Sequence, residues 1–187
     1  MTTIQTNDGI LPSLVVFAHG KESGPWGRKI KRLAEIAERF GANVLSPDYR
    51  DLDSPDERVA RLLALGLPPH GVLVLVGSSM GGYVSTVASG RLRPKGLFLL
   101  APAFGLAGYD IAVPAPCANH LFIVHGWQDE IIPAHSSIAF AERHRAEIHV
   151  LDDDHRLTAR ISEIGVLFEH FLIRCLDASA ASTGADR

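Results

Sequence analysis

Six short apolar runs recur along the chain and predict the strands of one sheet. They lie at residues 14–18, 44–45, 72–76, 96–100, 121–124 and 148–151. The runs are continuous rather than alternating with polar residues, which is typical of strands buried on both faces, as in a parallel sheet. Segments with helical spacing of apolar positions lie between or after the runs, at 28–40, 54–65, 80–89, 134–145 and 157–176. The alternation of strand and helix predicts an α/β fold with right-handed crossovers.

Two of the helix ends carry local signals in the sequence. Ser54 precedes Pro55, and Glu57 follows three residues after Ser54, as in a capping box with proline at the first helical position. Gly41 directly follows the helical segment 28–40, where a glycine commonly ends a helix.

The length of the chain favours one domain. Its 187 residues are enough for a single core and too few for two comfortable ones. We expect one domain over residues 1–176 and a frayed polar tail over 177–187. The longest stretch without periodicity, 102–116, is too short for a folded lid domain. Loops at the carboxyl ends of strands form the ligand sites of open α/β sheets, so this segment is expected to be a wall of the pocket.

Composition and charge exclude several classes of protein. Apolar residues make up 47% and charged residues 21%, as in a globular protein rather than a disordered one. The net charge of −3 argues against nucleic acid or an anionic membrane surface as the main partner. No basic leader with an apolar run opens the chain, and no stretch reaches the length of a membrane span. Cys117 and Cys175 are expected to be reduced thiols, and the protein is expected to be cytoplasmic.

A candidate nucleophile follows the strongest apolar run. Residues 77–81 read Gly-Ser-Ser-Met-Gly, which matches the pattern G-x-S-x-G. In this motif the central serine, here Ser79, sits on a sharp and strained turn from strand to helix that exposes its hydroxyl above the sheet. The pattern alone is weak, but its position between a predicted strand and a predicted helix is the context that the mechanism requires. Ser78 is the alternative nucleophile.

An acid and a base follow the serine in the order that a catalytic triad on such a sheet requires. A serine hydroxyl needs a base, and the base needs a partner that fixes its tautomer. Asp129 comes shortly after the run 121–124, and His155 lies between the last run and the last helix. Both are therefore expected at the same carboxyl edge of the sheet as Ser79. Alternatives remain open: Asp129 as a surface turn residue, and one of the aspartates at 152–154 as the partner of His155.

Four motifs in order resemble the α/β-hydrolase superfamily, in particular its small, cap-free bacterial esterases and dienelactone-hydrolase-like members. They are an H-G pair at 19–20 followed by Lys21, the elbow at 77–81, the stretch 125–133 that fits H-G-x-x-D-x-x-(V/I)-P, and the late His155. The resemblance spans about residues 14–176 and implies a minimal, mostly parallel sheet of about six strands flanked by helices, without a lid. Ser79 stands where dienelactone hydrolases have cysteine, which favours a general esterase, and Asp154 stands where a small residue often precedes the histidine.

The remaining site residues follow from this fold. The backbone N–H of Met80, after the nucleophile, is expected to be one donor of the oxyanion hole. The resemblance implies the backbone N–H of Lys21 as the other, with Glu22 as the fallback. Trp26 and Trp127 are each expected either to line the substrate pocket or to serve packing alone. His19 and His125 are interpreted as residues that shape loops.

These features predict a serine hydrolase that cleaves small carboxylic esters or thioesters through an acyl-enzyme. The absence of a lid predicts a preference for short acyl chains. No phosphate-binding motif and no metal-ligand spacing of histidines occurs, so no cofactor, metal or nucleotide is expected. A non-catalytic binding or regulatory protein of the same fold is the alternative from another class, and perhydrolase or lyase chemistry at the same triad is a third. The oligomeric state cannot be read from the sequence.

Overall fold

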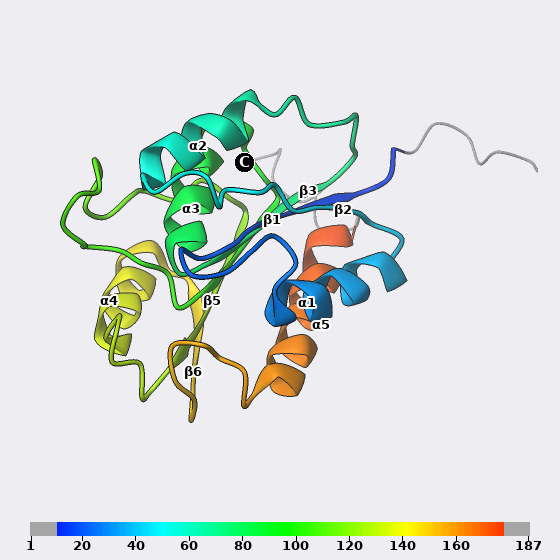
Figure 1. Ribbon diagram of the computed structural model, residues 1–187. Coiled ribbons are helices and arrows are strands. Elements are labelled where there is room, and N and C mark those ends of the chain that lie inside the picture. The colour runs from blue at the N-terminus through cyan, green and yellow to red at the C-terminus, as the bar shows by residue number, and fades with distance from the viewer. Residues whose placement is uncertain (1–10, 178–187) are drawn as a thin grey trace, which may run out of the picture.

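The computed structural model describes residues 11–177, and these form a three-layer α/β structure (Figure 1). The strands are β1 (Leu14–Ala18), β2 (Asn43–Leu45), β3 (Leu73–Ser78), β4 (Gly96–Leu100), β5 (His120–Gly126) and β6 (Glu147–Leu151). The helices are α1 (Arg28–Arg39), α2 (Pro55–Ala64), α3 (Met80–Leu92), α4 (Ala134–His144) and α5 (Ile161–Leu176). The described part of the chain contains no helix long and apolar enough to cross a membrane.

The six strands form one sheet in the order β2-β1-β3-β4-β5-β6, and every neighbouring pair is parallel. All strands therefore end at the same edge of the sheet, and the loops that follow them gather there. Helices α1 and α5 cover one face, and α2, α3 and α4 cover the other (Figure 1). The expected six-stranded parallel sheet flanked by helices is confirmed.

The apolar runs supply two cores at once, because successive side chains of a strand point to opposite faces. In β1, Val15 and Phe17 pack under α1 and α5, while Leu14, Val16 and Ala18 pack under α2 and α3. All five residues are buried. This two-sided burial is the physical reason why the runs are continuous in the sequence.

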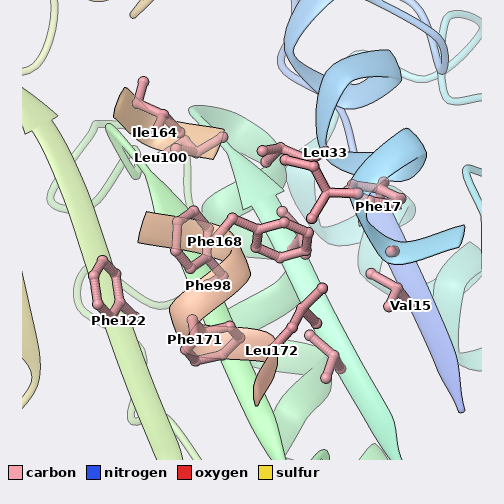
Figure 2. Close-up of a cluster of buried hydrophobic side chains, with 14 of the residues drawn as sticks. Val15, Phe17, Leu33, Phe98, Leu100, Phe122, Ile164, Phe168, Phe171 and Leu172 are labelled. Carbon is pink, nitrogen blue, oxygen red and sulfur yellow. The ribbon is translucent and has the colours of Figure 1, made fainter. Parts of the chain in front are cut away.

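Aromatic side chains fill the core beneath α5 (Figure 2). The ring of Phe98 in β4 stacks on Phe122 in β5, with centroids 5.0 Å apart. Phe168 of α5 meets Phe98 edge-on at 5.1 Å, and Phe171 lies 5.2 Å from the same ring. Four rings from two strands and one helix therefore fix α5 against the middle of the sheet.

Local signals at helix ends agree with the structure, with one exception. Ser54 caps α2, its hydroxyl accepting a hydrogen bond from the Glu57 amide at 3.3 Å, and Gly41 follows α1 with φ of 73°. The last helix, expected from residue 157, begins at Ile161 instead. Leu157 has φ of 52°, which interrupts a helix, and the Asp153 carboxylate accepts a hydrogen bond from the Arg160 amide. Most of the tail expected to be frayed, residues 178–187, lies outside the described residues.

Removing one ring from the α5 core is expected to destabilise the fold strongly. Phe168 is fully buried, so Phe168→Ala leaves a cavity among the neighbouring rings and should lower the free energy of unfolding by about 3–5 kcal/mol. Urea denaturation followed by circular dichroism measures the loss. Val166→Ala, on the exposed side of the same helix, is the control and should change stability by about 0.5 kcal/mol or less. Equal losses in the two variants would contradict this packing.

Candidate active site

Ser79 occupies a strained turn between β3 and α3. Its backbone has φ of 55° and ψ of −121°, a region that non-glycine residues rarely adopt. Hydrogen bonds of the Ser79 backbone hold this turn in place. The Ser79 amide donates to Leu100 at 2.9 Å, and its carbonyl accepts from Gly82 at 2.8 Å and from Ala103 at 3.0 Å. These three bonds to neighbouring elements offset the strain and hold the serine at the carboxyl edge of the sheet.

The two glycines of the motif allow the close approach that this turn requires. A Cβ atom on Gly77 would lie 2.2 Å from the Gly81 carbonyl oxygen. A Cβ atom on Gly81 would lie 1.9 Å from the Ala18 carbonyl oxygen in β1. Both contacts are with backbone, which cannot move aside. The residue types of G-x-S-x-G are thus dictated by contacts between β1, β3 and α3.

Ser79, His155 and Asp129 lie in one hydrogen-bonded line. The Nε2 atom of His155 is 3.0 Å from the Ser79 hydroxyl oxygen, and its Nδ1 atom is 2.7 Å from Asp129 Oδ2. The Asp129 side chain is fully buried, whereas the His155 side chain is 17% exposed. Residues separated by 76 and 26 positions in the sequence therefore meet at the edge where β3, β5 and β6 end.

The partners of the line determine which nitrogen of His155 carries the proton. Asp129 Oδ1 accepts hydrogen bonds from the amides of Ile131 at 3.0 Å and Ile132 at 2.8 Å, as an ionised carboxylate does. Its Oδ2 then accepts from Nδ1–H of His155. Nε2 is left as an acceptor for the Ser79 hydroxyl, which is the tautomer that a general base requires.

His125 is a buried partner of Asp129 that sequence analysis interpreted only as shaping its loop. Its Nε2 atom lies 3.0 Å from Asp129 Oδ2 and 2.8 Å from the Ile132 carbonyl oxygen. Both are acceptors, so Nε2 carries a hydrogen, and Nδ1 accepts from the Ser137 hydroxyl at 2.8 Å. Asp129 Oδ2 is thereby bound by two imidazoles. The signal in the sequence was the spacing of four positions that links His125, at the end of β5, to Asp129 in the loop that follows.

The aspartates at 152–154 hold the loop that carries His155 rather than the imidazole itself. Asp153 accepts hydrogen bonds from the amides of Asp154 and Arg160, each at 2.8 Å. Asp154 accepts from the Arg156 amide at 2.8 Å. The loop also packs on the end of β5, since a Cβ atom on Gly126 would lie 2.3 Å from the Asp153 carbonyl oxygen. This contact brings the loops of Asp129 and His155 together.

The candidate oxyanion hole lies between the nucleophile turn and the loop after β1. Met80 is the first residue of α3, so its N–H has no partner within the helix. Gly20 lies against the nucleophile, since a Cβ atom on it would be 3.4 Å from Cβ of Ser79. Lys21 follows, and both Met80 and Lys21 line the cavity beside Ser79. Their role as donors stays a prediction.

Two buried side chains orient the peptide between Gly20 and Lys21. The Gly20 carbonyl oxygen lies 2.8 Å from Nδ1 of His19 and 3.4 Å from Nη1 of Arg58, and both residues are buried in the interior. His19 itself accepts a hydrogen bond from the Tyr49 amide at 3.0 Å. In a trans peptide the C=O and N–H point in opposite directions, so the Lys21 N–H is directed away from the interior. No motif in the sequence pointed to Arg58.

A cavity of about 690 Å³ opens beside Ser79 and His155. Its size is that of a site for a small molecule. The segment 102–116, expected to form a pocket wall, contributes Ala103, Leu106 and Tyr109 to its lining. Tyr109 packs edge-on against Tyr83 of α3 at 4.6 Å, which anchors this wall to the fold.

The two tryptophans do not line this cavity. Trp26 is 44% exposed and Trp127 is 60% exposed, so both indoles lie against solvent rather than in the pocket. Of the two roles left open for each tryptophan, lining of this cavity is therefore not observed. Both residues lie in loops at the carboxyl edge of the sheet, as expected. The sequence does not encode the direction in which each side chain leaves its loop.

Among residues 11–177, no three histidines, cysteines or acidic residues gather as metal ligands would. Ser78 lines the cavity too, but the imidazole of His155 is bonded to Ser79. The class of α/β hydrolases is defined by a parallel sheet with helices on both faces and by a serine on a strand-to-helix turn, followed by an acid and a histidine on later loops. This chain has all of these features. The sequence model of the Alpha/beta hydrolase family matches residues 15–163, and the chain belongs to this family.

Solved structures agree with this assignment. A protein from Xanthomonas campestris pv. campestris, described as a hydrolase of the alpha/beta superfamily, is 35% identical, with a TM-score of 0.80 over 86% of this chain and 98% of that one. An α/β serine hydrolase without a lid from Xanthomonas campestris is 21% identical, with a TM-score of 0.75 over 91% and 85%. Est1E from Butyrivibrio proteoclasticus is 19% identical, with a TM-score of 0.75 over 90% of each chain. The comparison with curated proteins gave no match.

Family membership and the 35% identical relative identify the chain as a hydrolase. The expected small, lidless member of the superfamily is confirmed by these comparisons. The bond that is cleaved and the roles of the individual residues remain predictions.

Acidification is expected to destabilise the fold through its two buried histidines. Burial lowers the pKa of both His19 and His125 below the usual value, against the pull of their hydrogen-bond partners. The unfolded chain therefore binds more protons below about pH 6.5, and stability falls there with decreasing pH, by up to about 1.4 kcal/mol per pH unit for each histidine. Urea denaturation between pH 7.5 and pH 5 measures this slope.

The matched variant for this measurement is His125→Gln. A glutamine amide retains a donor toward the Ile132 carbonyl but does not titrate. The variant should lose stability less steeply on acidification than the wild type. An identical slope in both proteins would show that His125 does not contribute to the pH dependence.

Proposed function

We propose that this protein hydrolyses small carboxylic esters, or thioesters, through a Ser-His-Asp triad and an acyl-enzyme. The observation that carries the proposal is the hydrogen-bonded line from Ser79 through His155 to the buried Asp129. The tautomer of His155 derived from its partners is the one that accepts a proton from serine. A protein that only bound a ligand would have no need for a strained serine, an oriented imidazole and a buried carboxylate in one line.

In this mechanism His155 Nε2 takes the Ser79 proton as Oγ attacks the ester carbonyl. The negative charge that develops on the carbonyl oxygen is stabilised by the amides of Met80 and Lys21. Asp129 stabilises the imidazolium, and His155 returns the proton to the leaving alcohol. Water then attacks the acyl-enzyme by the same route, and Ser79 is regenerated.

Removing the Ser79 hydroxyl is expected to abolish both labelling and turnover. A fluorophosphonate probe should add once to the wild type, as measured by intact mass, and not to Ser79→Ala. Hydrolysis of p-nitrophenyl acetate should fall about a thousandfold or more, because the nucleophile is lost. Ser78→Ala is the neighbouring control and should still be labelled. Absence of labelling on folded wild type would instead favour the binding-protein alternative.

The open pocket is expected to favour short acyl chains. Residues 11–177 include no lid domain over the cavity beside Ser79, so a long acyl chain would lack the apolar cover that a lid supplies. The kcat/KM of p-nitrophenyl esters should therefore be highest for acetate to butyrate and should fall about tenfold or more toward palmitate, which is the scale set by a few kcal/mol of lost binding. Good turnover of the palmitate with poor turnover of acetate and butyrate would contradict this expectation.

A further inference from the structure

Cationic side chains outnumber acidic ones in the lining of the cavity beside Ser79, although acidic residues are the more numerous in the chain as a whole. Among residues 11–177, four lysines and arginines line this cavity but only one acidic residue does, Glu22. The chain as a whole carries a net charge of −3, so the cavity has the opposite sign to the molecule. The four cations come from two strand-end loops and the start of α1: Lys21, Arg28, Lys29 and Arg156.

These four side chains form no ion pair within 4 Å among the residues that the structure describes. Six arginines elsewhere do form such pairs, at positions 32, 39, 50, 61, 160 and 174. Cations without a direct ion-pair partner around a concave site can attract an anion there, because low-dielectric walls concentrate their field.

Lys29 is the innermost of the four, being half-buried while the others are exposed. The nearby carboxylates are engaged by other donors. Asp129 is bound by two imidazoles and two amides, Asp153 by the amides of Asp154 and Arg160, and Asp154 by the Arg156 amide. Burial lowers the pKa of Lys29 to about 8, although these carboxylates pull it the other way. These carboxylates attract Lys29 from a distance, but among the described residues none forms an ion pair with it within 4 Å, so its ammonium has no direct ionic partner.

The position of Arg28 and Lys29 is unfavourable for helix α1 itself. They occupy its first turn, which contains no acidic residue, and the positive end of a helix dipole repels cations by about 0.3–1 kcal/mol each. Helix stability therefore gives no reason for two cations at these positions. A ligand anion in the adjoining cavity would offset the repulsion.

We propose that this site takes esters that carry a second, anionic group, a carboxylate, and that Lys29 with Arg28 binds that group while Ser79 attacks the ester carbonyl. This inference rests on the proposed esterase function and deepens it by naming a substrate class. The carboxylate forms charge-assisted hydrogen bonds to the two side chains, and the apolar part of the substrate contacts Ile30, Leu106 and Ile131 of the lining.

The test compares matched esters with and without a carboxylate. p-Acetoxybenzoate carries the charge on the alcohol side and is paired with its methyl ester. Mono-p-nitrophenyl adipate carries it on the acyl side and is paired with p-nitrophenyl hexanoate. For the wild type, kcat/KM should be about tenfold or more higher for the anionic member of at least one pair, the scale of one hydrogen bond to a charged group. The preference should shrink in high salt, because ions screen the attraction.

Lys29→Gln should remove most of this preference, measured as the ratio of kcat/KM between the anionic and the neutral member of a pair, because the charge-assisted bond to the carboxylate is lost. Lys31→Gln is the matched control, since Lys31 is an exposed residue of the same helix that does not line the cavity. It should keep the full preference. Neutral esters turned over as well as anionic ones by the wild type, or equal effects of the two substitutions, would overturn the inference.

Failure of the esterase function itself is distinguishable from failure of this inference. Without that function the probe does not label Ser79 and no ester is hydrolysed, whereas a wrong inference leaves neutral esters as good substrates. Calorimetric binding of p-acetoxybenzoate and of its methyl ester to Ser79→Ala tests the anion site without turnover. Tighter binding of the carboxylate, lost in Ser79→Ala/Lys29→Gln, supports the site, and equal binding of both compounds refutes it.

Discussion

The backbone turn at Ser79 is the constraint on which the rest of the site depends. A non-glycine residue at φ of 55° persists only where neighbouring elements hold it. Here β4 supplies the Leu100 carbonyl, the following loop supplies the Ala103 amide, and the Ala18 carbonyl of β1 leaves room for no side chain at Gly81. The sheet order β1-β3-β4 thus determines where the hydroxyl lies.

The parallel sheet then decides what surrounds that hydroxyl. All six strands end at one edge, so the loops after β1, β3, β5 and β6 lie together there (Figure 1). Buried polar residues fix these loops from below. His125 holds Asp129, while His19 and Arg58 turn the peptide at Gly20. The hydrogen-bonded line of Ser79, His155 and Asp129 and the peptide that precedes the Lys21 amide are thus supported by buried side chains, the kind of support that would preorganise the proposed active site.

The charged residues of the cavity are the part of the site that would set its substrate specificity. In the proposed mechanism the triad and the amide donors act on the ester carbonyl, which all ester substrates share. The lining residues would distinguish between substrates, and here they combine apolar side chains with the unpaired cations of α1 and its neighbouring loops. Because one fold hosts many activities, the charge of the pocket lining is the feature from which we infer the substrate class.

Much of this architecture is encoded locally, and the sequence by itself determined it. Continuous apolar runs specified strands buried on both faces, and the motif at 77–81 with the later Asp129 and His155 specified which side chains meet. Tertiary structure alone decided the rest. Arg58 reaches Gly20 across 38 residues, Trp26 and Trp127 turn to solvent, and the carboxylates of 153 and 154 bind loop amides rather than the imidazole. Periodicity within a short window reports burial, but the direction of a side chain leaving a loop depends on packing partners that are distant in the sequence.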